Sequence, residues 1–203
     1  MGPFRHLDQI LGTLTDLLNT SPQIAGVEQL GDVEAITAFA QARSVSEIGR
    51  PTDADIAPLH RVRRRFLTVF TTEDEAARIA IINELLASAA IEPRLVEHDG
   101  WGLHFHFFSP YISLSEHLNA DCAMALAVLV ASGESSRLRV CARPGCNRVM
   151  VDSSRNRSRA YCDSRTCGNR VHASAYRDRQ RGEDPTTELA QRPNPPRRAQ
   201  VGQ

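Results

Sequence analysis

The sequence predicts a mostly helical α+β protein followed by a small cysteine-rich module. Three features support this fold class. Apolar residues recur at helical spacing in several stretches of the first 130 residues, two short segments flank an Asp-Gly dipeptide, and four of the five cysteines lie between residues 141 and 167. At 203 residues, the chain is long enough for one domain with a real hydrophobic core and a small additional module.

Four helices are expected in the first 90 residues. The first spans residues 7–18, and the second is capped by Asp32 and continues to about residue 43. A third begins at Asp53 and carries an apolar stripe through Val69. A fourth is predicted over residues 72–89, with Thr72 as its N-cap and acidic residues near its start that complement the helix dipole.

A β-hairpin and a long helix are expected next. The segments 94–98 and 103–108 are joined at Asp99-Gly100, a dipeptide that favours tight hairpin turns. Ser113 or Ser115 then caps a helix that continues to about residue 131. Because the second half of this helix is apolar on nearly every face, we expect it to be the buried central helix.

Charge is distributed unevenly along a chain whose formal net charge is zero. Residues 1–136 carry 9 Arg and 18 Asp or Glu, whereas residues 137–181 carry 12 Arg and 3 Asp. This positive excess indicates a polyanionic partner. The N-terminus lacks the pattern of a secretory signal, and the longest apolar run, 122–131, is shorter than the roughly 20 residues of a membrane span. We therefore expect a cytoplasmic protein with no membrane partner.

The clustered cysteines form two pairs of equal spacing with fifteen residues between them: Cys141-x4-Cys146 and Cys162-x4-Cys167. In a reducing compartment this layout favours a structural Zn²⁺ site with four thiolate ligands over disulfides. Pro144-Gly145 predicts the turn of the first pair, and Asp163 or Ser164 is expected to cap a helix at the second. An Fe–S cluster is a less favoured alternative. Cys122, in the apolar helix, is expected to pack in the core.

The cysteine module also resembles a known family. Its cysteine spacing, the run 152–159 and the Cys-Gly-Asn-Arg tetrapeptide 167–170 are similar to the CGNR zinc finger. The preceding region is similar to the ABATE domain at residues 17–20, at Gly31-Asp32 and in the arginine-rich stretch 61–65. Such proteins are regarded as stress-linked bacterial transcription regulators, so the resemblance implies zinc ligation and DNA binding.

Three parts are therefore expected along the chain. Residues 1–132 form an ABATE-like domain that senses a small-molecule effector or mediates self-association, for example as a homodimer. Residues 137–181 form the four-Cys finger, a zinc-ribbon-like or treble-clef-like module. Residues 182–203, which contain several prolines, read as a disordered tail.

The arginine pattern of the finger predicts binding to duplex DNA. The expected contacts come from the Ser/Arg loop and the last helix: Arg155, Arg157, Arg159, Arg170 and Arg177. Two alternatives remain open. One is a zinc-stapled module that binds an acidic protein. The other is an RNA-binding protein, which the scarcity of aromatic residues near the finger disfavours.

Two further groups of residues have more than one interpretation. His104 and His106 share a face of the second strand, and near Trp101 they could line a ligand pocket or bind a metal, although such a face is more often the outer side of a half-buried sheet. The arginines of the stretch 61–65 fit a solvated helix face better than a second nucleic-acid patch. The sequence has no recognised catalytic motif, and a closed four-Cys site has no position for a catalytic water, so no enzyme activity is expected.

Overall fold

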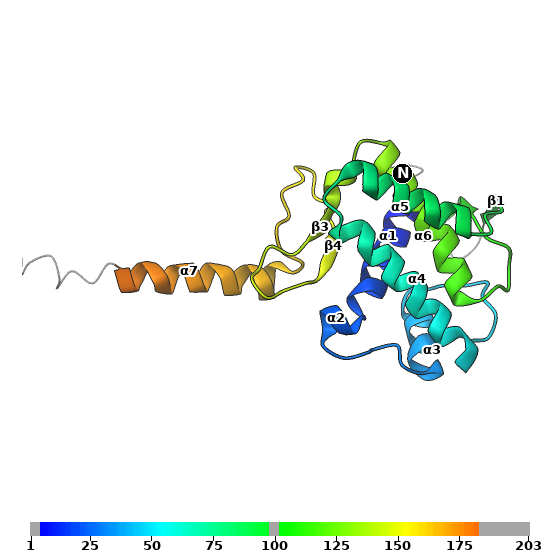
Figure 1. The fold of residues 1–203 in the computed structure, drawn as a ribbon, viewed down its shortest axis with the longest axis horizontal. Helices are drawn as coiled ribbons and strands as arrows, with labels where there is room; N and C mark the ends of the chain where they lie inside the picture. The colour runs from blue at the N-terminus through cyan, green and yellow to red at the C-terminus, as the bar shows by residue number, and fades with distance from the viewer. Residues whose placement is uncertain (1–4, 98–101, 183–203) are drawn as a thin grey trace, which may run out of the picture. The chain divides into compact units, whose positions relative to one another are not determined.

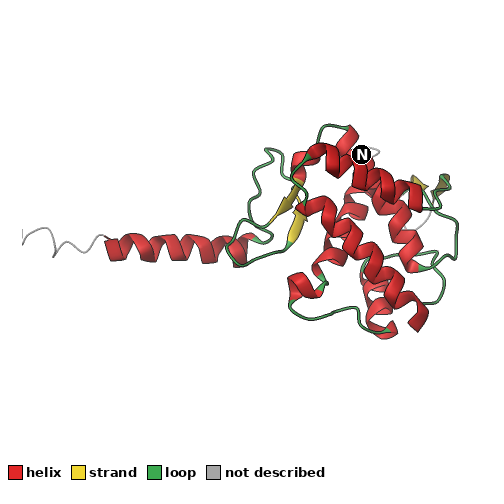
Figure 2. Ribbon diagram, viewed as in Figure 1, coloured by secondary structure: helices red, strands yellow, loops and turns green. Residues whose placement is uncertain are grey.

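The computed structural model describes residues 5–97 and 102–182, and these are mostly helical, as predicted, with two small hairpins where the sequence predicted one (Figure 2). The chain divides into two compact units, Met1–Cys162 and Asp163–Gln203. Trp101 and the tail beyond residue 182 lie outside the described residues, so the expectations for them are not addressed by the structure.

Four long helices form the body of the first unit: α1 (Arg5–Asn19), α4 (Asp53–Thr71), α5 (Glu75–Ser88) and α6 (Leu114–Ala131). They pack against one another, while α3 (Val33–Ala42) lies against α4 and the short α2 (Pro22–Ala25) follows α1 (Figure 1). Apolar residues at helical spacing provide fully buried side chains from each of the four, including Leu14, Phe66, Leu85 and Leu126. One continuous core results.

Side-chain caps fix the starts of two predicted helices. Asp32 caps α3, where its Oδ1 accepts a hydrogen bond of 2.8 Å from the backbone N–H of Ala35. Ser113, rather than Ser115, caps α6 and forms a capping box with Glu116. Because these partners lie three residues apart, the helix starts are readable from the sequence.

The prediction that Thr72 caps the next helix is wrong. The backbone N–H of Thr72 donates to the carbonyl of Thr68, so this residue ends α4. Asp74 caps α5 instead, accepting a hydrogen bond of 2.7 Å from the N–H of Ala77. Both residues are suitable caps, and the C-terminal end of α4 decides between them.

The central helix α6 is most buried in its first part, not in its apolar second half. Its buried residues run from Leu114 to Leu126 and include the polar His117, Asn119 and Asp121, whereas residues 127–130 are only half-buried. Among the described residues, α6 is the one helix long and apolar enough to cross a membrane, but 61% of it is buried inside the fold. Such burial is expected of the core helix of a folded protein.

The two hairpins have different roles. Strands β1 (Arg94–Glu97) and β2 (Leu103–His106) pair antiparallel, as the Asp-Gly signal predicts. Strands β3 (Leu138–Val140) and β4 (Val149–Val151) also pair antiparallel, and Leu138 and Val149 belong to the same core as the helices. The first part of the cysteine module is therefore built onto the helical body.

A single asparagine joins β4 to the end of α1. The Asn19 amide donates a hydrogen bond of 3.0 Å to the carbonyl of Val149, and its side-chain oxygen accepts one of 3.0 Å from the N–H of the same residue. Both residues are buried. Asn19 thus takes the place of a neighbouring strand for Val149, which would otherwise bury two unpaired backbone groups.

The second unit contains a π-helical turn, Ser164–Gly168, followed by α7 (Asn169–Gly182). Cys167 and Gly168 are buried, and Val171 is half-buried. The remaining α7 side chains whose exposure the structure describes are all exposed, including that of Ala175. This helix therefore presents polar and positively charged residues around much of its surface.

Candidate metal centre and nucleic-acid surface

The first cysteine pair lies on a tight turn that follows β3. Gly145 has a φ of +72°, a conformation that glycine adopts without strain, and the N–H of Cys146 donates to the carbonyl of Arg143 at 3.0 Å. The N–H of Cys141 donates to the carbonyl of Arg148 at 2.8 Å, which closes the turn at its base. These bonds bring Cys141 and Cys146 to the same end of the hairpin.

The second pair is positioned by an aspartate cap. Asp163, rather than Ser164, caps the π-helical turn, with its Oδ1 accepting a hydrogen bond of 2.7 Å from the N–H of Thr166. The bonds from the Thr166 backbone and hydroxyl hold the pKa of Asp163 below its ordinary value. The N–H of Cys167 donates to the carbonyl of Asp163 at 3.0 Å, so Cys167 is held in the first turn of the helical segment.

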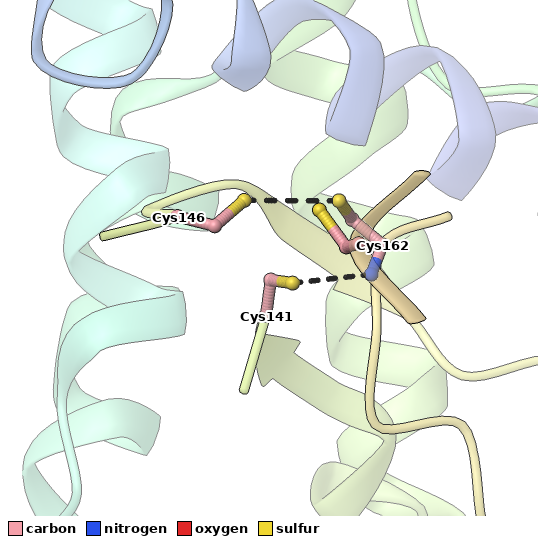
Figure 3. A group of neighbouring side chains, drawn as sticks. Cys141, Cys146 and Cys162 are labelled. Carbon is pink, nitrogen blue, oxygen red and sulfur yellow. Dashed lines mark hydrogen bonds between the residues drawn. The ribbon is translucent and has the colours of Figure 1, made fainter. Parts of the chain in front are cut away.

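Together the cysteines form a cluster suited to one metal ion. The four sulfur atoms, those of Cys141, Cys146, Cys162 and Cys167, all lie within 4.8 Å of one another. The Sγ atoms of Cys146 and Cys162 are 3.8 Å apart, and the N–H of Cys162 points at the Sγ of Cys141 at 3.4 Å (Figure 3). Tetrahedral Zn²⁺–S bonds of about 2.3 Å place neighbouring sulfurs about 3.8 Å apart, so the donor set fits such an ion.

The structure joins none of these four cysteines in a disulfide. The 3.8 Å between two of the sulfurs is far longer than a disulfide bond of about 2.05 Å. Cys122, in contrast, lies fully buried in α6, and burial raises the pKa of its thiol well above the ordinary value. It is a core residue, as predicted, and its thiol stays protonated, whereas a metal ligand must be a thiolate.

Asp152 organises the Ser/Arg loop, residues 153–159. Its fully buried side chain accepts hydrogen bonds of 2.9 Å from the N–H groups of Ser154 and Arg159, one to each oxygen, at the two ends of the loop. Burial acts to raise the pKa of Asp152, but the bonds from Ser154 and Arg159 lower it on balance. The sequence pattern did not identify this role, although an aspartate directly before a Ser-Ser dipeptide is a turn signal.

Two arginines at the start of the cysteine module hold this loop through hydrogen bonds to backbone carbonyls. Arg137 donates to the carbonyls of Asp152 and Ser154, at 2.6 and 2.9 Å. Arg139 donates to the carbonyls of Arg157 and Arg159, at 2.7 and 3.3 Å. The positive excess of the module therefore has a structural component, which the charge count alone does not reveal.

The five arginines predicted to contact DNA differ in their surroundings, although all five are exposed. Arg157 forms an ion pair of 2.5 Å with Glu134, and Arg159 donates to the carbonyls of Tyr161 and Cys162. Within the described residues, the side chains of Arg155, Arg170 and Arg177 make no hydrogen bond or ion pair. These three carry guanidinium groups that are available to a partner.

The arginine stretch 61–65 of α4 was predicted to be a solvated helix face, and the structure corrects this for one residue. Arg63 is only 3% exposed, and its guanidinium forms a two-pronged ion pair with Glu28 and a hydrogen bond of 2.9 Å with Thr20. Arg61 and Arg64 are exposed, as expected. Arg63 therefore connects α4 to the loops around α2, and its partners lie 35 and 43 residues away in the sequence.

The predicted ligand residues of β2 point into the fold rather than to solvent. His104 and His106 are buried, and together with His6 of α1 they line a cavity of about 50 Å³. The third residue of that prediction, Trp101, lies outside the described residues. His117 and Asp121 of α6 line the same cavity. Burial lowers the pKa of His117 to about 3 and raises that of Asp121 to about 7, so both are neutral at moderately acidic pH.

Comparison with known families identifies both parts of the chain. The model of the ABATE family, described as "Putative stress-induced transcription regulator", matches residues 13–133. The model of the CGNR zinc finger matches residues 137–180. Both matches agree with the resemblance read from the sequence. No curated protein matches the chain.

Proposed function

Because this chain belongs to the ABATE family of transcription regulators and carries a CGNR zinc finger, we propose that it is a cytoplasmic regulator that binds duplex DNA through the finger. The observation that carries this proposal is the set of exposed arginines in the Ser/Arg loop and on α7. Phosphate groups attract such side chains without regard to sequence, and guanine edges accept their bidentate hydrogen bonds.

The metal of the cluster is proposed to be Zn²⁺, held by Cys141, Cys146, Cys162 and Cys167. Four thiolates in a tetrahedron suit this ion, and the 3.8 Å between the Sγ atoms of Cys146 and Cys162 agrees with its bond length. The ion would act as a structural staple, because four protein ligands leave no open position for a reacting water. We therefore propose no catalytic role for this site.

Arg155 is the clearest candidate for a phosphate contact. It lies in the loop held by Asp152, so its backbone is fixed while its side chain remains exposed and, among the described residues, without a bonded partner. Arg170 and Arg177 lie on the exposed helix α7 and are the candidates for base contacts. Arg157 must first leave Glu134 or share its guanidinium with it.

The salt dependence of DNA affinity tests the proposal. Titration of a labelled duplex with the zinc-loaded full-length protein should give a log K against log salt slope near −4 to −5 if about five phosphates are neutralised. Arg155→Ala should weaken binding to every sequence and reduce the magnitude of the slope by roughly one. The matched control is Arg64→Ala, which removes an exposed arginine of α4 and should leave the slope unchanged.

Glu134 provides a variant with the opposite expected effect. Its carboxylate pairs with both Arg137 and Arg157, and these bonds lower its pKa. Glu134→Gln removes the negative charge that competes with phosphate for Arg157, so DNA affinity should increase. Zinc content must remain one ion per chain in each variant.

The same titrations separate the alternatives. Equal or tighter binding of single-stranded RNA would favour an RNA-binding protein. The proposal would be refuted if the zinc-loaded protein showed no salt-dependent affinity for any duplex. If that protein instead bound an acidic protein under the same conditions, the protein-interaction module would become the favoured function. If α7 reads bases, Arg170→Ala or Arg177→Ala should narrow the affinity gap between selected and random duplexes.

A second role is proposed for the helical domain. The cavity lined by His6, His104 and His106 supports a sensing function, because buried polar groups around a concave site are typical of ligand sites. An effector would regulate DNA binding only if it binds the free and DNA-bound states with different affinity.

A further inference from the structure

Strand β2 buries its histidines and exposes its large apolar side chains. His104 and His106 are 8% and 3% exposed, whereas Leu103 and Phe105 are 67% and 55% exposed. This arrangement is the reverse of ordinary hydrophobic preference, because burial of an imidazole costs more than burial of leucine or phenylalanine. The buried histidines must therefore contribute something that apolar packing does not.

Each of the two rings has its Nδ1 atom beside an oxygen acceptor. The Nδ1 of His104 is 2.7 Å from the carbonyl oxygen of Gly102, and the Nδ1 of His106 is 3.2 Å from Oε2 of Glu47. These partners assign the ring proton to Nδ1, because an oxygen acceptor requires a donor opposite it. The Nε2 atom of each neutral ring then carries a lone pair.

Those two Nε2 atoms face each other at 3.1 Å. Two lone pairs at this distance repel unless a shared proton or a metal cation lies between them. Bonds of about 2.0–2.1 Å from one metal ion to two imidazoles place the nitrogens about 2.9–3.4 Å apart at common coordination angles. The observed separation therefore suits two ligands of the same ion.

His6 supplies a third imidazole from the first turn of α1. One ring nitrogen from each of His6, His104 and His106 lies within 4.8 Å of the other two. The cavity that they line, about 50 Å³, holds an ion with a few waters but is far below the roughly 300–1,000 Å³ of pockets for organic ligands. Its size selects an ion as the ligand.

Three neighbouring groups complete the environment of a cation. His117 lines the same cavity and is 6% exposed, and its buried Nδ1 has no hydrogen-bond partner within the described part of the chain. Asp121 also lines the cavity, with its Oδ2 atom 3.5 Å from Nε2 of His117. Glu47 bonds the far side of the His106 ring, and metal-binding histidines commonly have a carboxylate in this position.

We propose that His6, His104 and His106 bind a divalent first-row transition-metal ion at a second metal site, with Glu47 as a positioning residue. Three imidazoles suit Zn²⁺, Co²⁺, Ni²⁺ or Cu²⁺ and leave at least one coordination position for water or an exchangeable ligand. This inference rests on the sensing role proposed for the helical domain and names the class of ligand that the domain would sense. Because metal binding is measured without DNA, the metal site and the DNA-binding function can each be refuted without the other.

Titration with Co²⁺ tests the site directly. The full-length protein, with zinc in the four-cysteine site, is titrated with Co²⁺, and the metal content per chain is measured by mass spectrometry after removal of free ions. The expected result is one zinc and one cobalt per chain. Cobalt bound by imidazoles should give ligand-field absorption without the sulfur-to-cobalt charge-transfer band that the cysteine site would produce.

Variants assign the ion to the three histidines. His106→Gln and His6→Ala should each abolish stoichiometric cobalt binding while the zinc content stays at one. His6 is only half-buried, so His6→Ala serves if His106→Gln does not fold. Glu47→Gln should weaken cobalt binding by roughly 10–100-fold. His172→Ala, which removes an exposed histidine of α7, is the matched control and should bind cobalt as the wild type does.

Two results would overturn the site. One is a wild-type protein that takes up no second metal in excess Co²⁺, as expected if a shared proton bridges His104 and His106; a protonated ring seen by nitrogen NMR would identify that case. The other is unchanged cobalt affinity in a folded His6→Ala protein.

Discussion

Replacement of Asn19 by alanine should destabilise the first unit by about 2–4 kcal/mol, because it removes both hydrogen bonds to Val149. Val149 is only 1% exposed, so its N–H and C=O groups would remain buried without partners. Each such group costs about 1–3 kcal/mol, and entry of some water from the polar space beside Asn19 places the sum in the lower part of the range.

Urea unfolding followed by circular dichroism, with excess zinc present throughout, would measure this loss. Asn83→Ala is the matched control, because Asn83 is exposed on α5 and the same substitution there should change stability by less than about 0.5 kcal/mol. Strand β4 starts three residues after Cys146, so Asn19→Ala should also release the metal at a lower chelator concentration.

Equal unfolding midpoints for Asn19→Ala and Asn83→Ala would refute the argument that Asn19 secures β4. Loss of metal without loss of helix stability would show instead that the hairpin unfolds separately from the helical body. The shared core predicts that the stability of the helices and the retention of metal fall together in Asn19→Ala.

Two further substitutions test contacts that the structure revealed. Asp152→Asn should lower the melting temperature at pH 7. Because the fold lowers the pKa of Asp152 below its ordinary value of 3.8, the stability that Asp152 provides is present above pH 4 and is lost as pH falls through the folded pKa. Melting temperatures of the wild type and the variant should therefore converge in acid, and a constant difference between them at every pH would contradict this reasoning. Arg63→Met should lower the free energy of unfolding in urea by about 3 kcal/mol, since it leaves Glu28 without its main partner. Wild-type stability in the double variant Arg63→Met, Glu28→Leu would support a pairing role. An unchanged free energy of unfolding in Arg63→Met alone would refute it.

Local patterns were sufficient for much of the fold. The periodicity of α1, α3 and α4, and the caps Asp32 and Ser113, depend on residues within one or two helical turns of each other. The clustered cysteines and the tetrapeptide at residues 167–170 identified the finger for the same reason. Choices between two nearby caps were less secure, as Thr72 shows, because both candidates satisfy the local rule.

The orientation of β2 could not be obtained in this way. Alternation along the strand shows that His104 and His106 share a face, but it does not say which face meets the helices. Hydrophobicity alone would place Leu103 and Phe105 inside, and the structure does the opposite. The partners that favour the observed orientation, Glu47 and His6, lie far away in the sequence.

The sequence by itself determined most of the helices, the hairpin of β1 and β2, the clustering of four cysteines and the excess of arginine in the finger, because each of these follows from composition or short-range spacing. Only the tertiary structure decided which arginines are structural, that Arg63 is buried with Glu28, and that Asn19 holds β4. The physical reason is that a buried polar group must find its partner wherever the fold brings one, here across as many as 130 residues, and no local pattern records that distance.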